Sequence, residues 1–241
     1  MSVENGEWIM YGVDEDDPYC IHTVDELIEY IDAVGFLPLF KNDIPGFSVE
    51  ERTVPDYWWT GKPQDPWYWR EVIARSGKVA YGKFFHGRAG FISTKWLPDF
   101  VNYRRDGYDF DALWDDAKAN VRSKKIMDCF DEKTEKLSFE LKQQAGFGKG
   151  GEKNFDGIVT GLQMQLYLCV KDFRQKINKK GVAYGWPIAV YCMPEHLWGR
   201  ELVTSAYRED PAESGEKIFA YIKETYPIAT EKQIRRILGR K

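Results

Sequence analysis

Two stretches of the chain combine carboxylates, arginines and aromatic rings, and these residue types suit a hydrolysis that passes through a cation. The first stretch surrounds Asp65 and Arg70 with the rings of Trp58, Trp59, Trp67, Tyr68 and Trp69. The second, "YRRDGYDFD", places Arg104, Arg105, Asp106, Tyr108, Asp109 and Asp111 on one loop. A ring can stack on a flipped base, and a carboxylate that an arginine keeps charged can stabilise a developing sugar cation.

The same residues also have a structural interpretation. Tryptophans dominate protein cores, and Arg–Asp pairs commonly hold loops in place. We favour the structural interpretation for Trp58 and Trp59. Both interpretations stay open for Asp65 with Arg70 and for Arg104 with Asp106.

A strongly basic turn follows in the second half, within "GLQMQLYLCVKDFRQKINKKGVAYGWPIAVY". Residues 171–180 hold five cations and one acid, although the whole chain has a net charge of −4. Cations on a projecting turn can displace counterions from a nucleic-acid duplex. Lysines that only keep a solvated turn soluble are the alternative, and we favour duplex binding. The candidate phosphate contacts across the chain are Lys149, Lys153, Lys171, Arg174, Lys176, Lys179, Lys180, His86, Arg88, Arg104 and Arg105.

The charge is unevenly distributed along the chain. Residues 1–60 carry a net −12 and the remaining residues a net +8, and a basic region concentrates polyanions around it. The acidic N-terminus does not look like a signal peptide, and the apolar runs are far shorter than the roughly 18 residues of a membrane span. We therefore expect a soluble, cytoplasmic protein without a membrane partner.

Several common kinds of catalytic site have no sequence support. The chain has no HExxH, no CxxC and no GxSxG motif, and Cys20, Cys129, Cys169 and Cys192 lie far apart. We expect reduced thiols, no metal and no cofactor. The loop "GFGKGG" lacks the GxxxxGK[ST] pattern of a nucleotide-binding loop and is interpreted as a flexible connector between helices.

The periodicity predicts an α+β fold that is mainly helical with short β-hairpins. In the first half it predicts helices over 23–34 and 66–76 and a hairpin over 79–92. In the second half, helices over 122–132, 137–147 and 155–165 precede strands over 166–173 and 182–191, the order of a winged helix-turn-helix. A second, degenerate copy in the first half would make the arrangement tandem. The expected divisions are an acidic tail 1–20, an α+β module 21–120, a winged-helix module 121–200 and a helical segment 201–241.

Several stretches of the chain together resemble a known family. Two long ones are "LSFELKQQAGFGKGGEKNFDGIVTGLQMQLYLCVKDFRQK" and "KKGVAYGWPIAVYCMPEHLWG", and "DPWYWR", "YGKFFHGRAGFIS" and "NYRRDGYDFD" lie upstream. With these stretches the chain resembles the AlkZ-related proteins, small relatives of the AlkZ and YcaQ winged-helix DNA glycosylases, over roughly residues 22–240. The resemblance implies tandem winged-helix modules and binding of double-stranded DNA. It also implies excision of alkylated bases, or unhooking of interstrand crosslinks, by metal-free hydrolysis of the N-glycosidic bond.

The resemblance also suggests catalytic residues. The larger enzymes carry a Gln-x-Gln or Gln-x-Asp signature near the N-terminus, and Gln163-Met164-Gln165 matches that string at the end of a predicted helix. The chain is shorter than those enzymes, and its pair lies elsewhere, so a polar helix end is the alternative. Gln163, Gln165 and Asp65 are the catalytic candidates.

Three functions follow from these observations. The leading one is a DNA-binding relative of the glycosylases that repairs alkylated DNA. The alternative is a non-enzymatic winged-helix transcription regulator, and a small-molecule enzyme that uses the Trp/Asp/Arg residues ranks last. The oligomeric state is left open.

Overall fold

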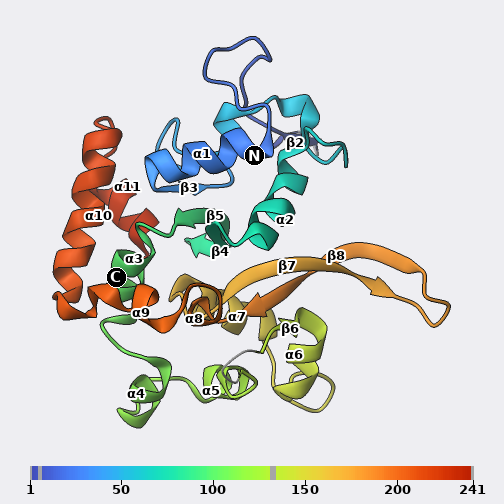
Figure 1. Cartoon of the computed structure of the whole chain (residues 1–241), viewed down its shortest axis with the longest axis vertical. Coiled ribbons are helices and arrows are strands. Elements are labelled where there is room, and N and C mark those ends of the chain that lie inside the picture. Colours follow the sequence, from blue (N-terminus) through green and yellow to red (C-terminus); the bar gives the residue numbers. More distant parts are fainter. Residues whose placement is uncertain (1, 5–6, 131–133, 240–241) are drawn as a thin grey trace.

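An antiparallel sheet runs through the middle of the molecule. The computed structural model describes residues 2–4, 7–130 and 134–239. Within them the strands are β1 (Ser2–Glu4), β2 (Glu7–Ile9), β3 (Phe36–Pro38), β4 (Val79–Phe85), β5 (Arg88–Ser93), β6 (Lys136–Leu137), β7 (Cys169–Ile177) and β8 (Ala183–Cys192). β1 and β2 pair with each other, and the other six form one sheet in the order β3-β5-β4-β7-β8-β6 (Figure 1).

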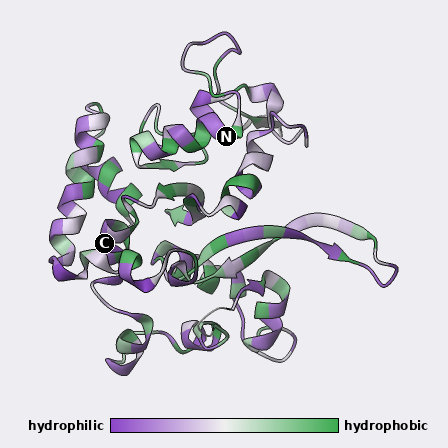
Figure 2. Cartoon of the chain, viewed as in Figure 1, coloured by the Kyte–Doolittle hydropathy of each residue, from purple (hydrophilic) through white to green (hydrophobic). Residues whose placement is uncertain are grey.

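Helices surround this sheet. They are α1 (Val24–Val34), α2 (Pro66–Ser76), α3 (Leu97–Arg105), α4 (Phe110–Asp115), α5 (Val121–Met127), α6 (Ser138–Gln144), α7 (Phe155–Met164), α8 (Pro194–Trp198), α9 (Arg200–Val203), α10 (Pro211–Thr225) and α11 (Glu231–Leu238), with short 3-10 turns at Glu50–Arg52, Pro55–Tyr57 and Ser205–Arg208. Most of them carry both hydrophilic and hydrophobic residues, as expected of helices with one buried side (Figure 2). The predicted α+β class is confirmed.

Local sequence signals set the ends of the two predicted N-terminal helices. Thr23 caps α1 by accepting a hydrogen bond from the Glu26 N–H, and Gly35 ends the helix at a φ of 82°. Asp65 caps α2 in the same way through the Trp67 N–H, and Gly77 ends it in the left-handed conformation. Both predicted helices are confirmed within a residue.

The predicted short hairpins are wrong in one respect, because the two hairpins are parts of one larger sheet. β4–β5 and β7–β8 form where they were expected, but Tyr81 of β4 pairs with Val170 of β7 and joins them. β3 and β6 then extend the sheet at its two ends. Joining the hairpins pairs strand edges that would otherwise expose unpaired backbone groups.

Two hydrophobic cores flank the sheet. The larger includes Leu27 and Ile31 of α1, Phe36 of β3 and Phe100 of α3. The smaller brings together α5, α6 and α7 through the buried residues Ile126, Met127, Leu141, Phe155, Val159 and Leu162. The three helices thus pack together ahead of β7–β8 in the predicted order. The winged-helix assignment itself, and its tandem form, stay predictions.

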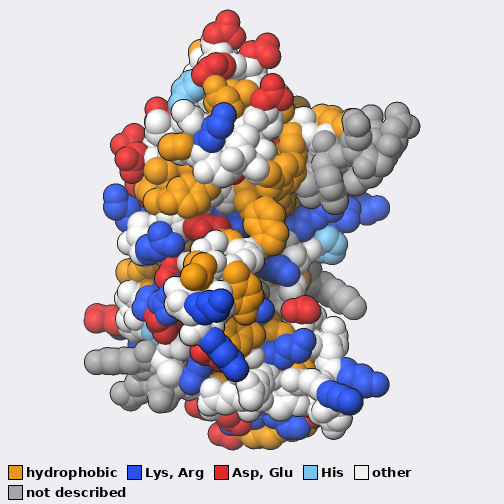
Figure 3. Space-filling view, turned by 90° about the vertical axis from the view of Figure 1, so that its right-hand side faces the viewer, with side chains coloured by type: hydrophobic (Ala, Val, Ile, Leu, Met, Phe, Trp, Pro, Cys, Tyr) orange, Lys and Arg blue, Asp and Glu red, His pale blue; other side chains and the backbone are white. Residues whose placement is uncertain are grey.

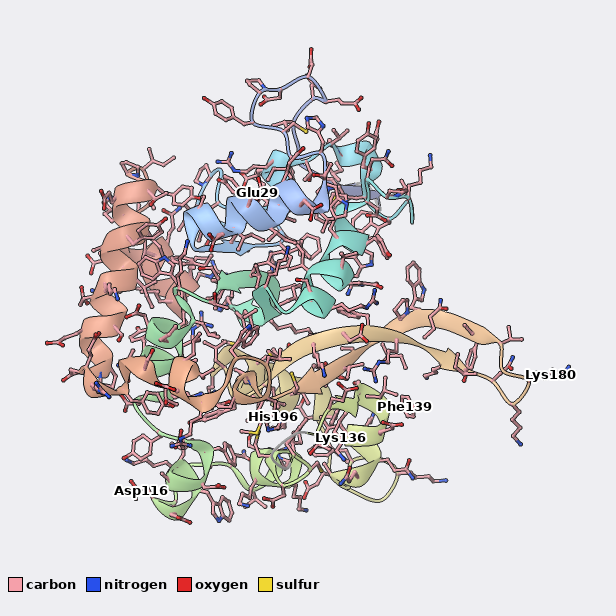
Figure 4. All side chains as sticks on the ribbon, in the orientation of Figure 1. Glu29, Asp116, Lys136, Phe139, Lys180 and His196 are labelled. Atoms are coloured by element: carbon pink, nitrogen blue, oxygen red, sulfur yellow. The ribbon has the colours of Figure 1, made fainter. Side chains whose placement is uncertain are left out.

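The β7–β8 hairpin extends well beyond the helices (Figures 1 and 4). Its inner end is buried at Cys169, Val170 and Cys192, whereas its outer end exposes large apolar side chains. Lys180 lies at the far end of the hairpin (Figure 4). The hairpin is therefore anchored in the sheet at one end and solvated at the other.

Candidate nucleic-acid interface and cavity

The cations of the β7–β8 hairpin fall into an inner and an outer group. In the inner group, Lys171 Nζ lies 2.6 Å from Glu135 Oε2, and Arg174 Nη2 lies 2.5 Å from Glu135 Oε1. Arg174 also binds Asp172 at 2.9 Å. The hydrogen bond from Lys171, joined by one from Arg174, lowers the pKa of Glu135. The charges of the inner group are thus largely neutralised within the protein.

The outer group consists of Lys176, Lys179 and Lys180, which are exposed. Within the described part of the chain these three lysines form no ion pair. On the side from which the hairpin projects, Lys and Arg side chains lie beside hydrophobic ones, with acidic side chains among them (Figure 3). The outer group is therefore free to contact an external anion.

The glycine-rich connector before α7 exposes two further cations. Lys149 and Lys153 are both exposed, and the Lys153 carbonyl accepts a hydrogen bond from Arg122 at 3.4 Å. An ion pair of 2.6 Å between Lys125 and Glu152 ties this connector to α5.

A cavity of about 650 Å³ lies between α2 and the sheet. It is lined by Phe40, Trp67, Arg70, Tyr81, Gly82, Lys83, Gly87, Arg88, Ala89, Gln163, Val170, Phe173, Pro187, Ala189 and Tyr191. Among these residues are five aromatic rings and three cations, and no Asp or Glu. Such a lining favours a flat ligand that carries or borders negative charge.

Arg70 forms one wall of this cavity. Its guanidinium lies 3.8 Å from the centre of the Trp67 ring and 4.1 Å from that of Phe173, and it pairs with Glu71 at 3.2 Å. The residue is 4% exposed, and its buried Nε has no hydrogen-bond partner among the described residues. The wall therefore offers a planar cation held between two rings.

Titratable residues in and beside the cavity have pKa values shifted mainly by burial. Burial raises the pKa of Glu71, and the charge of Arg70 acts in the opposite direction. Burial likewise raises the pKa of Tyr81, again opposed by Arg70, and raises the pKa of Tyr191 to about 12. At neutral pH both tyrosine hydroxyls stay protonated and can donate hydrogen bonds to a ligand.

The two glutamines of the Gln-x-Gln string lie in different places. Gln163 is 1% exposed and lines the cavity. Its Oε1 accepts a hydrogen bond from the Lys83 N–H at 3.0 Å, and its Nε2 donates to the Val159 carbonyl at 3.4 Å. Gln165 caps the end of α7, is exposed, and lines a smaller hollow with Arg104. Only the first glutamine therefore faces the aromatic cavity.

Asp65, the third catalytic candidate, is 1% exposed and bonded to backbone N–H groups. Oδ1 accepts from Trp59 at 3.0 Å and from Trp67 at 2.8 Å, and Oδ2 accepts from Gly61 at 2.9 Å. These three bonds fold the preceding loop onto the start of α2. They give Asp65 a structural task.

The two adjacent arginines of α3 are bonded inside the fold. Arg104 donates to the carbonyls of Met164, Ile237 and Leu238, and burial lowers its pKa to about 9. Arg105 is 3% exposed and binds Glu195 and the Leu166 carbonyl, each at 2.5 Å. Their donors join α3 to the end of α7 and to the C-terminal helices.

The turn between β4 and β5 places cations at the rim of the cavity. His86 and Arg88 are exposed, and His86 adopts a φ of 51° in the turn. Arg88 lines the cavity together with Lys83. Sequence reasoning missed Lys83 and Tyr81, although their spacing of two residues in a strand indicates that they share a face.

Other site types are absent from the described residues. No group of three or more His, Cys, Asp or Glu side chains in residues 2–4, 7–130 and 134–239 is placed to hold a metal ion. No helix in the same residues has the length and apolar character needed to cross a bilayer.

Comparison with known proteins gives one family. No curated protein and no solved structure matches the chain. The model of the family described as AlkZ related matches residues 21–239, which confirms the resemblance carried by the quoted stretches. Since this match covers nearly the whole sequence, the chain belongs to the AlkZ-related family.

Proposed function

We propose that the protein is a cytoplasmic DNA-binding protein that grips double-stranded DNA with the outer end of β7–β8 and hydrolyses the N-glycosidic bond of an alkylated base. The base would leave the stack and enter the cavity between α2 and the sheet. One observation carries this proposal: Gln163, from the string that matches the glycosylase signature, faces an aromatic cavity bordered by cations. Membership of the AlkZ-related family supports it.

The lining of the cavity suits an extruded nucleotide. A flipped base is held by stacking on rings and by hydrogen bonds to its edge. Tyr81, Phe173 and Tyr191 offer the rings, and the tyrosine hydroxyls and Gln163 offer hydrogen bonds. Lys83 and Arg88, both exposed at the rim, are suited to the flanking phosphates.

Gln163 has hydrogen-bonding capacity left for a water molecule. A side-chain amide has two N–H donors and two acceptor lone pairs, and each of its two polar atoms makes one bond inside the protein. One donor and one acceptor therefore remain to orient a water beside the sugar. In the reaction the bond from C1′ to the base nitrogen breaks and its electron pair leaves with the base. The water oxygen bonds to C1′ and releases a proton to solvent.

The absence of a carboxylate from the described lining favours a substrate that is already activated. An N-alkylated purine carries a positive charge and leaves as a neutral base, so its departure needs no proton from the protein. The rings hold the flat base by stacking, and the cations of the lining favour the negative phosphates beside it. The cavity would thus select lesions whose glycosidic bond is weakened by alkylation.

An excision assay tests the proposal with a matched pair of variants. Duplex DNA containing 7-methylguanine is incubated with the protein, and abasic sites are cleaved with alkali and counted on a gel. Gln163→Ala should lower the excision rate roughly 100-fold, the typical loss of one positioned polar group. Gln165→Ala removes an identical side chain from outside the cavity and should leave the rate unchanged.

Circular dichroism and thermal unfolding check that Gln163→Ala is folded, and Gln163→Glu gives a second variant of nearly the same shape. Equal excision by wild type and folded Gln163→Ala would contradict the catalytic assignment. Wild-type protein that binds the duplex without producing abasic sites would contradict the proposed reaction.

The second candidate is a DNA-binding regulator without enzymatic activity. The described lining residues include no carboxylate that could act as an acid or a base, which favours the regulator. An aromatic cavity of about 650 Å³ can hold a flat effector without acting on it. Selection of bound sequences from a random duplex pool distinguishes the two. Enrichment of one operator sequence, without excision, supports the regulator.

A further inference from the structure

Three large aromatic side chains beside the cavity are exposed. Trp59 is 38%, Tyr68 43% and Trp186 78% exposed. They come from the loop before α2, from α2 itself and from β8, and they line a second hollow of about 470 Å³. This hollow adjoins the first cavity, since Trp67, Phe173 and Pro187 line both. We call Trp59, Tyr68 and Trp186 the aromatic ledge.

Trp59 is presented by an unfavourable backbone conformation. Its φ is 60°, in the left-handed region that residues with bulky side chains rarely adopt. The Trp59 N–H donates to the buried carboxylate of Asp65 at 3.0 Å, and Asp65 also holds Gly61. Behind it, the buried ring of Trp58 packs edge-on against the Trp59 ring at 5.9 Å. Strain of this kind persists where the surrounding structure enforces it, often at binding sites.

Trp186 and its neighbours on the hairpin have the charge pattern of an anion-binding surface. Tyr184, two residues away on β8, is 50% exposed and pairs with Lys176 of β7. Among residues 173–191, Lys176, Lys179 and Lys180 form no ion pair with any described residue, whereas Arg174 is paired with Glu135 and Asp172. Two carboxylates line the hollow, and both are already bonded: Asp65 to backbone N–H groups and Glu71 to Arg70. Hydrophobic and basic side chains adjoin one another on the side that carries the hairpin, with some acidic side chains among them (Figure 3). The ledge therefore suits a polyanion better than a partner without negative charge.

Exposed rings next to unpaired cations are the features that bind single-stranded nucleic acid. Each base offers a flat face to a ring, while the cations follow the backbone. In duplex DNA each base is already stacked on its neighbours. The rings of the ledge therefore cannot stack on the bases of a paired strand. We propose that the aromatic ledge binds a single strand of DNA by stacking its unpaired bases, next to the cavity that receives the extruded base. This inference rests on the proposed DNA binding but not on excision.

The test measures single-strand binding directly. The probe is a 5′-labelled oligothymidylate of roughly 12 nucleotides, within the site sizes of single-strand binding proteins, and binding is followed by fluorescence anisotropy and by tryptophan quenching. A fully paired duplex of the same length is the comparison. The wild type should bind the single strand, with quenching of its tryptophan emission.

Two variants remove one ring each without disturbing the fold. Trp186→Ala truncates a side chain that is 78% exposed. Trp59→Gly removes the ring and also relieves the backbone strain, since glycine adopts positive φ readily, so its melting temperature should stay equal or rise. Each should weaken oligothymidylate binding between about 5-fold and about 140-fold, the range for one stacked base. Tyr19→Ala, which removes a ring that is 73% exposed in the acidic N-terminal region, should change nothing.

The outcomes separate the ledge from the proposed function. Unchanged oligothymidylate binding by folded Trp186→Ala and Trp59→Gly overturns the ledge, even if excision is intact. A different outcome would overturn the excision proposal alone. In it, Trp186→Ala and Trp59→Gly lose oligothymidylate binding as expected, but the wild type makes no abasic sites. If Trp186→Ala instead converts an oligomer into a monomer in sedimentation, the ledge is a contact between copies and the proposal fails.

Discussion

Replacing Lys179 and Lys180 together tests the proposed binding of duplex DNA by the hairpin, through the salt dependence of the affinity. Both side chains are exposed at the end of the hairpin, and neither forms an ion pair within the described part of the chain. Lys171, in contrast, is already paired with Glu135 at 2.6 Å. The two tip lysines should therefore release counterions on binding, whereas Lys171 should release few.

The magnitude follows from counterion release. Each neutralised phosphate contributes about 0.9 to the slope of log K against log salt concentration, so Lys179→Ala/Lys180→Ala should make the slope shallower by about 1.8. Between 50 and 200 mM salt, the wild type should then lose about 12-fold more affinity than the double variant. Lys171→Ala, the matched control, should leave the slope nearly unchanged.

The assay is fluorescence anisotropy with an undamaged duplex at four or more salt concentrations. Truncation at an exposed tip should not alter the melting temperature, so a change in slope is not a folding defect. A double variant with the wild-type slope would refute the reasoning. So would a Lys171→Ala slope that falls as much as that of the tip variant, because the ion pair with Glu135 would then have no consequence.

Two further predictions concern stability. Asp65→Asn keeps the shape but weakens the acceptor of three backbone N–H groups, so thermal unfolding should show a loss of about 0.5–2 kcal/mol; an unchanged melting temperature would contradict the structural role. Glu135 has a pKa that the hydrogen bond from Lys171 lowers in the folded state, so its contribution is present above the unfolded pKa and is lost as the pH falls through the folded pKa. Urea unfolding should therefore show Glu135→Gln less stable than wild type at pH 7, with the difference shrinking once the pH falls below about 4 and vanishing below the lowered folded pKa; a difference that persists below that pKa would refute the ion-pair explanation.

The secondary structure was largely readable from local signals. Caps at Thr23 and Asp65 and the glycines after each helix fix the ends of α1 and α2, and alternation of side chains marks both hairpins. The pairing of the two hairpins into one sheet could not be predicted from the sequence. It depends on Tyr81 meeting Val170, far away in the chain, and a pairing of this kind leaves no local pattern.

The site was only partly predictable for the same reason. The Gln-x-Gln string pointed to Gln163, but a helix turns by about 100° per residue, so its partner Gln165 faces elsewhere. The cavity draws its lining from α2, β4, β5, α7, β7 and β8, and only the fold brings these together. Trp59 was expected in the core, yet the strained loop exposes it, because Asp65 bonds its backbone and not its ring.

The hairpin also sets a distance. Phe173, at the cavity, and Ile177, at the end of β7, belong to one continuous strand, and its four steps span about 13 Å. That length corresponds to about four base pairs of B-DNA. Under the proposed function, β7 would set the spacing between the extruded nucleotide and the lysines beyond Ile177. Adding two residues to each strand would preserve which side chains face the DNA and would move the outer contact about two base pairs along the duplex.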